Sequence, residues 1–268
     1  MHRVPTATAS DGTPIMYDVH GDGPPMILVH GIAESARTWD PLIEDLARAH
    51  RLLVPDLRGH GRSGSRDPYA LPTFAADVNA VATNEGVDGP DVILVGHSLG
   101  GTVVTAYAAM FPCCAVVNID QPLDLGSFQQ GLRQLAPLLR GSETDFGQAI
   151  AMVFDSMRGP LSPTETTRVE GIRRPEQAVV LGVWDAVIDT PIAELDELVQ
   201  SIATGVKVPY LSLHGLDPGV EYPAWLQSLI PTAIVEVWED HGHYPHLVDS
   251  PRFLDRLASF EASFSQGS

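Results

Sequence analysis

The possible folds of this chain are limited most by one stretch, Val92-Ile93-Leu94-Val95-Gly96-His97-Ser98-Leu99-Gly100-Gly101. Its first four residues are aliphatic without alternation, which is typical of a parallel strand buried on both faces. The alanine-rich residues that follow Ser98 predict a helix that is stopped by Pro112. Ser98 is therefore expected on a tight turn between a buried strand and a helix.

A serine on such a turn is presented as a nucleophile. The turn strains the serine backbone and brings neighbouring chain close, so side chains at Gly96 and Gly100 would clash. The hydroxyl of Ser98 then projects outward, while backbone N–H groups at the start of the helix point at the group that the hydroxyl attacks. We expect the N–H of Leu99 to be one of these donors.

The Gly-x-Ser-x-Gly pattern between a strand and a helix resembles the nucleophile elbow of the α/β-hydrolase superfamily. A second buried strand, 26–29, ends in His30-Gly31, which resembles the oxyanion-hole loop of that superfamily. The resemblance implies that the N–H of Ile32 is the second oxyanion donor. Epoxide hydrolases and haloalkane dehalogenases of the superfamily carry an aspartate at the elbow, so Ser98 argues against their alkyl-transfer chemistry.

The order of predicted elements indicates an α/β fold with a doubly wound, mostly parallel sheet. Buried strands are predicted at 26–29, 51–56, 92–95, 115–120, 208–215 and 233–238, and an edge strand at 15–19. Helices are predicted at 41–50, 71–85, 99–111, 223–229 and 252–264. Strands and helices alternate in this way on both sides of one long interruption.

The interruption contains only helical patterns, at 128–139, 145–157, 162–171, 175–185 and 192–203. An insertion of this size resembles the cap over the active site in many members of the superfamily. We therefore predict a core of residues 1–121 and 207–268, and a cap of residues 122–206 that is not an independent domain. The apolar side chains expected to line the substrate cavity are Phe128, Met152, Phe154, Met157, Trp184 and, beside the base, Tyr244.

A serine hydroxyl needs a neighbouring base, and His243 is the predicted one. Gly242-His243-Tyr244-Pro245, just after the last strand, matches the step that carries the base in the superfamily. His241, His243 and His246 also have a spacing that metal ligands use. A metal there would leave Ser98 without a base, so we predict neither a metal site nor another cofactor.

The carboxylate that orients His243 has two candidates. Asp217 follows the strand after the cap and precedes His243, which fits the usual order of serine, acid and histidine in the superfamily. Asp120 ends the strand after the elbow helix, a position from which some members take their acid. Both strand ends face the same edge of a parallel sheet, so the sequence leaves both open and favours Asp217.

Composition bears on partners and location. A formal net charge of −18 repels phosphate backbones and anionic lipid surfaces, which disfavours nucleic acid and membranes as partners. Cys113 and Cys114 are adjacent, which strains a disulfide between them, so we expect two thiols and a reducing compartment. Residues 1–11 carry no apolar signal segment. We expect a cytoplasmic protein with a small-molecule substrate; a homodimer is compatible with the sequence.

These residues predict a serine hydrolase that cleaves a small-molecule ester or lactone through an acyl-enzyme on Ser98, with His243 as general base and then general acid. The same parts serve a C–C bond hydrolase, a cofactor-free oxygenase or lyase in which His243 deprotonates the substrate, and a ligand-binding receptor with low turnover. The complete set of catalytic groups favours the enzyme over the receptor.

Overall fold

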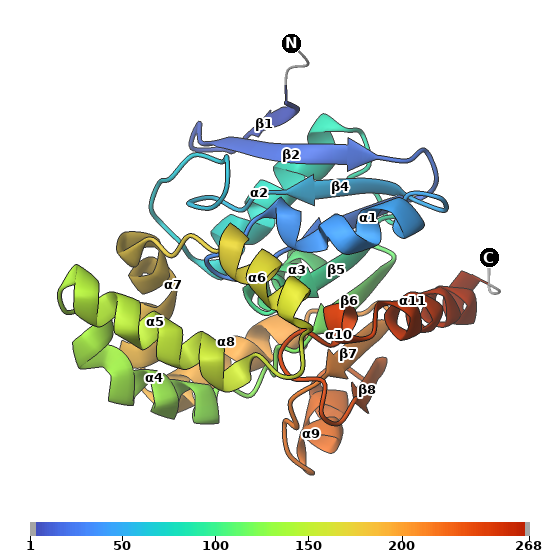
Figure 1. The fold of residues 1–268 in the computed structure, drawn as a ribbon. Helices are drawn as coiled ribbons and strands as arrows, with labels where there is room; N and C mark the ends of the chain where they lie inside the picture. Colours follow the sequence, from blue (N-terminus) through green and yellow to red (C-terminus); the bar gives the residue numbers. More distant parts are fainter. Residues whose placement is uncertain (1–3, 266–268) are drawn as a thin grey trace.

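The computed structural model describes residues 4–265. Its centre is an eight-stranded sheet in the order β1-β2-β4-β3-β5-β6-β7-β8 (Figure 1). The strands are β1 (Thr6–Thr8), β2 (Pro14–His20), β3 (Pro25–Val29), β4 (Arg51–Pro55), β5 (Ile93–His97), β6 (Ala115–Ile119), β7 (Tyr210–His214) and β8 (Ala233–Val237). β1 and β2 are antiparallel to their neighbours, and the other strands are parallel.

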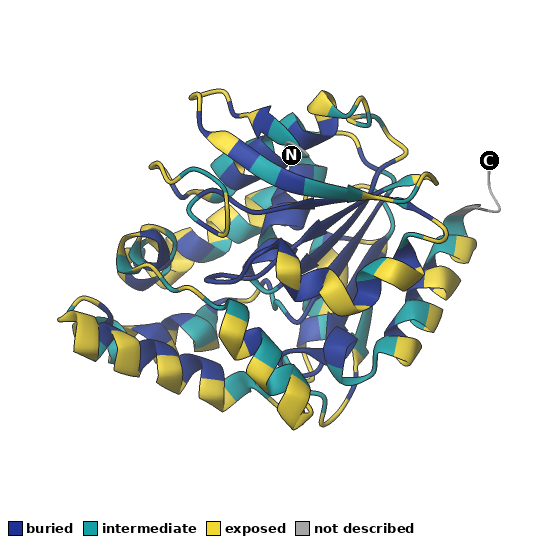
Figure 2. Ribbon diagram, turned by 45° about the horizontal axis from the view of Figure 1, so that its top comes forward, coloured by how far each residue is buried: buried dark blue, intermediate teal, exposed yellow. Residues whose placement is uncertain are grey.

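Helices cover both faces of this sheet, because every central strand is apolar on both sides. Alternate residues of β3 illustrate the division: Met26 and Leu28 join the core under α1 and α11, whereas Ile27 and Val29 join the core under α2 and α3. Figure 2 shows the central strands as the most buried layer, with helices exposed on their outer sides. The helices outside the insertion are η1 (Ala36–Trp39), α1 (Asp40–Leu46), α2 (Leu71–Asn84), α3 (Leu99–Met110), α9 (Tyr222–Leu229), α10 (Pro245–Val248) and α11 (Ser250–Ser265).

Between β6 and β7 the chain forms helices only. They are α4 (Gly126–Leu139), α5 (Glu143–Met157), α6 (Pro163–Ile172), α7 (Gln177–Asp189) and α8 (Ile192–Ala203), and we call them the helical insert. Its segments meet the loops that follow two strands, β3 and β8. The N–H of Arg174 donates to the carbonyl of Ala33 after β3, at 2.8 Å. The N–H of His243 after β8 donates to the carbonyl of Met157, also at 2.8 Å.

The predicted fold class is confirmed, and each predicted strand and helix has a counterpart within a few residues. The prediction of an edge strand at 15–19 is wrong. That segment is β2, which pairs with β4 on one side and with β1 on the other. The prediction fails because β1 has only three residues, too few to show alternation.

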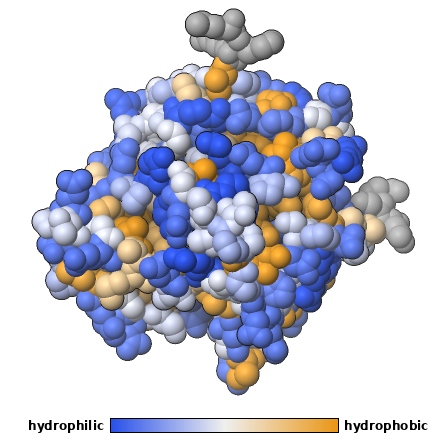
Figure 3. All heavy atoms as spheres, viewed as in Figure 1, coloured by the Kyte–Doolittle hydropathy of each residue, from blue (hydrophilic) through white to orange (hydrophobic). Residues whose placement is uncertain are grey.

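Figure 3 shows hydrophilic residues over much of the face in view, with apolar patches interrupted by them. Within residues 4–265, no helix is long and apolar enough to cross a bilayer.

Candidate active site

Ser98 lies between β5 and α3 in a strained backbone conformation, with φ 53° and ψ −124°. The turn is as tight as the glycine pattern predicts. A Cβ atom on Gly96 would lie 2.1 Å from the carbonyl oxygen of Gly100. One on Gly100 would lie 2.2 Å from the carbonyl oxygen of Val29. Contacts this short exclude any side chain, and Ser98 is left partly exposed at the end of the strand.

The loop after β3 approaches the same serine. A Cβ atom on Gly31 would lie 3.2 Å from Cβ of Ser98. Ile32 follows Gly31 in this loop, and Leu99 begins α3, so the two predicted oxyanion donors belong to adjoining segments. Both residues are buried.

His243 and Asp120 are in direct contact. Nδ1 of His243 lies 2.6 Å from Oδ2 of Asp120, and both side chains are buried. The other oxygen, Oδ1, accepts the N–H groups of Gly215 at 2.7 Å and Leu216 at 3.0 Å. Asp120 reaches this position with a left-handed φ of 51°, which is unusual for a residue with a side chain. Its carboxylate is therefore fixed from both oxygens.

The charge of Asp120 survives burial because of these contacts. Burial raises the pKa of its carboxyl, but the hydrogen bond and charge of His243, together with the N–H of Leu216, outweigh burial and bring the pKa below 3.8. A carboxylate that accepts the proton of Nδ1 fixes the tautomer of His243 and leaves Nε2 to act as a base.

The favoured candidate for this position, Asp217, is not the carboxylate beside His243. Asp217 is exposed on the loop after β7, and its Oδ1 accepts the N–H of Gly219 at 2.8 Å. The side chain thus closes its own turn. The expectation that Asp217 contacts His243 is corrected in favour of the alternative, Asp120.

Nε2 of His243 is buried and has no hydrogen-bond partner among residues 4–265. The ring lies beside the elbow, because its centroid is 4.6 Å from that of His97, the residue before Ser98. A buried ring nitrogen without a partner is costly in a packed interior. It is suited to receive a proton from a hydroxyl at the elbow.

The aromatic residues predicted to line the cavity are mostly buried. Phe128 and Trp184 pack edge to face with centroids 6.0 Å apart, and the Arg173 guanidinium lies 3.7 Å above the ring of Phe154. Tyr244 directs its hydroxyl to Glu34 rather than to open space. The expectation for Met152 is wrong, because its side chain is 55% exposed on α5. The carbonyl of Met157 accepts the N–H of His243 in the loop after β8, which we call the base loop.

The three histidines near the end of the chain do not converge. Nδ1 of His241 contacts the carbonyl of Glu239 at 2.8 Å, and His246 is fully buried against Trp39. Within residues 4–265, no cluster of His, Cys, Asp and Glu side chains could hold a metal ion.

Two residues at the site are not predicted from the sequence. Glu34 follows Ile32 by two positions, and His97 directly precedes Ser98; both are buried and face each other. The only feature of the sequence that points to them is that they lie next to or near predicted site residues.

Comparison with known proteins identifies hydrolases as similar to this chain. The model of the alpha/beta hydrolase family matches residues 26–256. Lipase LipV of Mycobacterium tuberculosis is 35% identical over 192 residues, which cover 68% of this chain and 60% of that protein. The crystal structure of the esterase RhEst1 from Rhodococcus sp. ECU1013 is 26% identical, covers 97% of this chain and 99% of its own, and has a TM-score of 0.75. The enol-lactonase from Burkholderia xenovorans LB400 has the same fold, with 19% identity, 96% and 100% coverage and a TM-score of 0.75.

Proposed function

The chain belongs to the alpha/beta hydrolase family of enzymes, whose model matches residues 26–256, and we propose that it is a serine hydrolase cleaving a small-molecule ester or lactone. The observation that carries the proposal is the environment of the two ring nitrogens of His243. Nδ1 contacts a buried carboxylate, and Nε2 is buried without a hydrogen-bond partner among residues 4–265, in a ring that packs against His97, the residue before Ser98.

In the first half of the reaction, the oxygen of Ser98 attacks the carbonyl carbon of the substrate, and Nε2 of His243 takes the hydroxyl proton. Asp120 keeps the other ring proton on Nδ1 and stabilises the imidazolium that forms. The N–H groups of Ile32 and Leu99 hold the oxyanion of the tetrahedral intermediate. The imidazolium then gives its proton to the leaving alkoxide, which leaves an acyl group on Ser98.

In the second half, water repeats the attack. Nε2 of His243 removes a proton from the water as its oxygen adds to the acyl carbon, and the same two N–H groups hold the new oxyanion. Collapse of that intermediate breaks the bond to Ser98, whose oxygen recovers the proton from His243. The products of an ester are a carboxylic acid and an alcohol, and those of a lactone are joined in one hydroxy acid.

The helical insert acts as a cap in this proposal. Its segments contact the loops after β3 and β8, which carry Ile32 and His243. Phe128, Phe154 and Trp184 extend the apolar core under these segments. A cap with these apolar side chains favours a substrate with an apolar acyl group or ring over a polar substrate. The names of the relatives, a lipase and an esterase, agree with ester cleavage.

The test is release of nitrophenol from short-chain p-nitrophenyl esters by the wild type and by Ser98→Ala. We expect the substitution to lower the rate by about 10⁴-fold or more, because no acyl-enzyme can form. Ser201→Ala, at an exposed serine of α8, is the matched control and should retain the wild-type rate. Labelling of Ser98 by a fluorophosphonate, read by peptide mass, locates the nucleophile independently.

Equal rates for the wild type and Ser98→Ala would reject the proposal in favour of a binding protein. Activity on a substrate that persists without any serine adduct would favour proton abstraction by His243 alone.

A further inference from the structure

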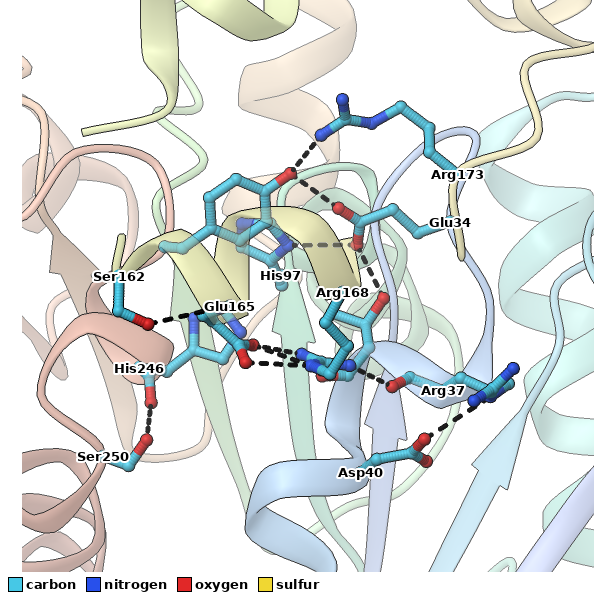
Figure 4. A network of polar contacts seen from close by, with 12 residues as sticks. Glu34, Arg37, Asp40, His97, Ser162, Glu165, Arg168, Arg173, His246 and Ser250 are labelled. Atoms are coloured by element: carbon cyan, nitrogen blue, oxygen red, sulfur yellow. Dashed lines mark hydrogen bonds and ion pairs between the residues drawn. The ribbon is translucent and has the colours of Figure 1, made fainter. Parts of the chain in front are cut away.

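A second buried carboxylate, that of Glu34, lies in the loop between β3 and η1. Figure 4 shows Glu34 facing the ring of His97, with Arg173 nearby. Oε1 accepts the hydroxyl of Tyr244 at 2.7 Å. Oε2 accepts the hydroxyl of Thr38 at 3.0 Å and the N–H of Gly31 at 3.3 Å, and it lies 3.6 Å from Nδ1 of His97. Glu34 is 2% exposed, so none of these contacts is shared with bulk water.

Some of these contacts close the turn from Gly31 to Glu34, which contains Ile32 and which we call the oxyanion loop. The backbone N–H of Glu34 donates to the carbonyl of Gly31 at 3.3 Å, and its carboxylate accepts the N–H of the same glycine. The turn between them contains Ile32 and forces Ala33 into the left-handed region, with a φ of 62°. That conformation costs about 1 kcal/mol for a residue with a Cβ atom. The two hydrogen bonds of Glu34 offset this strain and fix the direction of the Ile32 N–H.

Other contacts of Glu34 reach the base loop. Tyr244, which donates to Glu34, directly follows His243. His97 holds the base loop a second time, because its Nε2 lies 2.7 Å from the carbonyl of His243. A carbonyl only accepts hydrogen bonds, so Nε2 of His97 carries a proton, and the Nδ1 edge of the ring is turned to Glu34.

Glu34 remains a carboxylate despite its burial. Burial raises the pKa of its carboxyl, but the neighbouring His97, the hydroxyl of Tyr244 and the charge of Arg173 together hold that pKa well below the ordinary value of 4.5. Arg173 reaches this cluster from the helical insert and donates to the oxygen of Tyr244 at 3.1 Å. An ionised acceptor forms stronger hydrogen bonds than a neutral one, which suits a group that holds several loops.

We propose that Glu34 is a positioning residue that fixes the oxyanion loop and the base loop in one arrangement, with His97 extending its hold to the backbone of His243. This inference rests on the proposed function, because it assigns Glu34 to the geometry of acyl transfer. Glu34 touches no reacting atom. Its loss should therefore leave substrate binding intact and weaken the transition state.

The test compares Glu34→Gln with Thr38→Val. An amide at position 34 has one oxygen and one NH₂ group, so it cannot accept from both Gly31 and Tyr244. We expect kcat on a p-nitrophenyl ester to fall by about 10- to 100-fold with KM changed by less than about 2-fold. Thr38→Val removes another donor to the same carboxylate without touching either loop, and it should keep kcat within about 2-fold.

A trifluoromethyl ketone supplies the readout that a merely structural role would not move. Ser98 adds to its carbonyl carbon, the proton passes to His243, and the resulting alkoxide occupies the oxyanion position. The inhibition constant of an alkyl trifluoromethyl ketone should therefore weaken in Glu34→Gln by about the factor lost in kcat/KM. Melting temperatures of all variants separate this effect from a loss of folding.

The inference is overturned if Glu34→Gln keeps both kcat and ketone affinity, or if Thr38→Val loses as much of both. If Glu34→Gln does not fold, Tyr244→Phe decides, since it removes one donor and keeps the ring. It should lower kcat by about 5- to 10-fold at constant KM, and an unchanged kcat overturns the inference. A wild type without Ser98-dependent hydrolysis instead rejects the proposed function itself, which the wild-type assay shows before any variant is compared.

Discussion

The ends of β6 and β7 lie side by side at one edge of the sheet, and both are followed by an aspartate, yet only one aspartate reaches the base. Asp120, directly after β6, is 3% exposed and contacts His243. Asp217, after β7, is exposed and closes its own turn. β7 contributes backbone instead, because the N–H groups of Gly215 and Leu216 hold the second oxygen of Asp120. A carboxylate at a strand end thus becomes an orienting group when the neighbouring strand supplies donors for its other oxygen.

The largest expected effect separates the two aspartates directly. Asp120→Asn should lower kcat by about 10⁴-fold, because an amide does not hold the proton on Nδ1 of His243 or stabilise the imidazolium. Asp217→Asn can still accept the N–H of Gly219 and should change kcat by less than about 2-fold. Steady-state hydrolysis of a p-nitrophenyl ester by both variants makes the comparison. A larger loss in Asp217→Asn would reverse the roles of the two strand ends.

The choice between these aspartates shows where prediction from sequence stops. The buried strands are predictable because each is a short aliphatic run between turn residues. Which aspartate meets His243 depends on the left-handed φ of Asp120 and on two N–H groups more than ninety residues away in the chain. Neither feature has a local pattern, and the loop around Asp217 resembles the commoner arrangement. Local sequence patterns therefore predict which edge of the sheet carries the site, but not which aspartate at that edge contacts His243.

The helical insert shows a related limit. The periodicity of α5 identifies residues that share a face of the helix. It does not tell which face meets the sheet, and Met152 lies on the outer one. Glu34 escapes notice for another reason, because its partners come from η1, the elbow and the base loop, which meet only in the folded chain.

A smaller effect is expected where the loop after β7 supports the base. A Cβ atom on Gly215 would lie 2.1 Å from the carbonyl oxygen of Gly242, the residue before His243. Gly215→Ala should therefore displace the base loop and lower kcat/KM by about 100-fold. Gly219, further along the same loop, has open space around it but a φ of 100°. Gly219→Ala should cost about 1 kcal/mol of stability and leave kcat/KM within about 2-fold.

Thermal unfolding of both variants accompanies these rates. A folded Gly215→Ala with wild-type kcat/KM would show that the β7 loop holds Asp120 without positioning His243.

The smallest expected effect is on stability, and it distinguishes the two strand ends by pH. Burial lowers the pKa of His214, at the end of β7, from 6.5 to about 4, although the charges of Asp120 and Asp217 oppose the shift. The unfolded chain then binds a proton at His214 that the folded chain does not, so stability falls as the pH drops from 6.5 towards 4. At pH 5 the loss from this group is about 2 kcal/mol. Asp120 acts in the same direction but at lower pH, because its lowered pKa stabilises the fold above pH 3.8 and that stability is lost only below it.

Between pH 7 and 5, acid sensitivity should therefore come from the β7 end and not from the β6 end. His214→Gln keeps a side-chain amide near the hydroxyl of Ser212, which His214 contacts at 2.7 Å, and removes the titrating ring. Urea unfolding at pH 7 and pH 5 should show a smaller decrease in the free energy of unfolding for His214→Gln than for the wild type, by about 2 kcal/mol. His241→Gln, at a partly exposed ring, is the matched control and should follow the wild type. Equal decreases in all three proteins would mean that other buried histidines, such as His60 and His246, carry the acid sensitivity, since burial lowers their pKa values too.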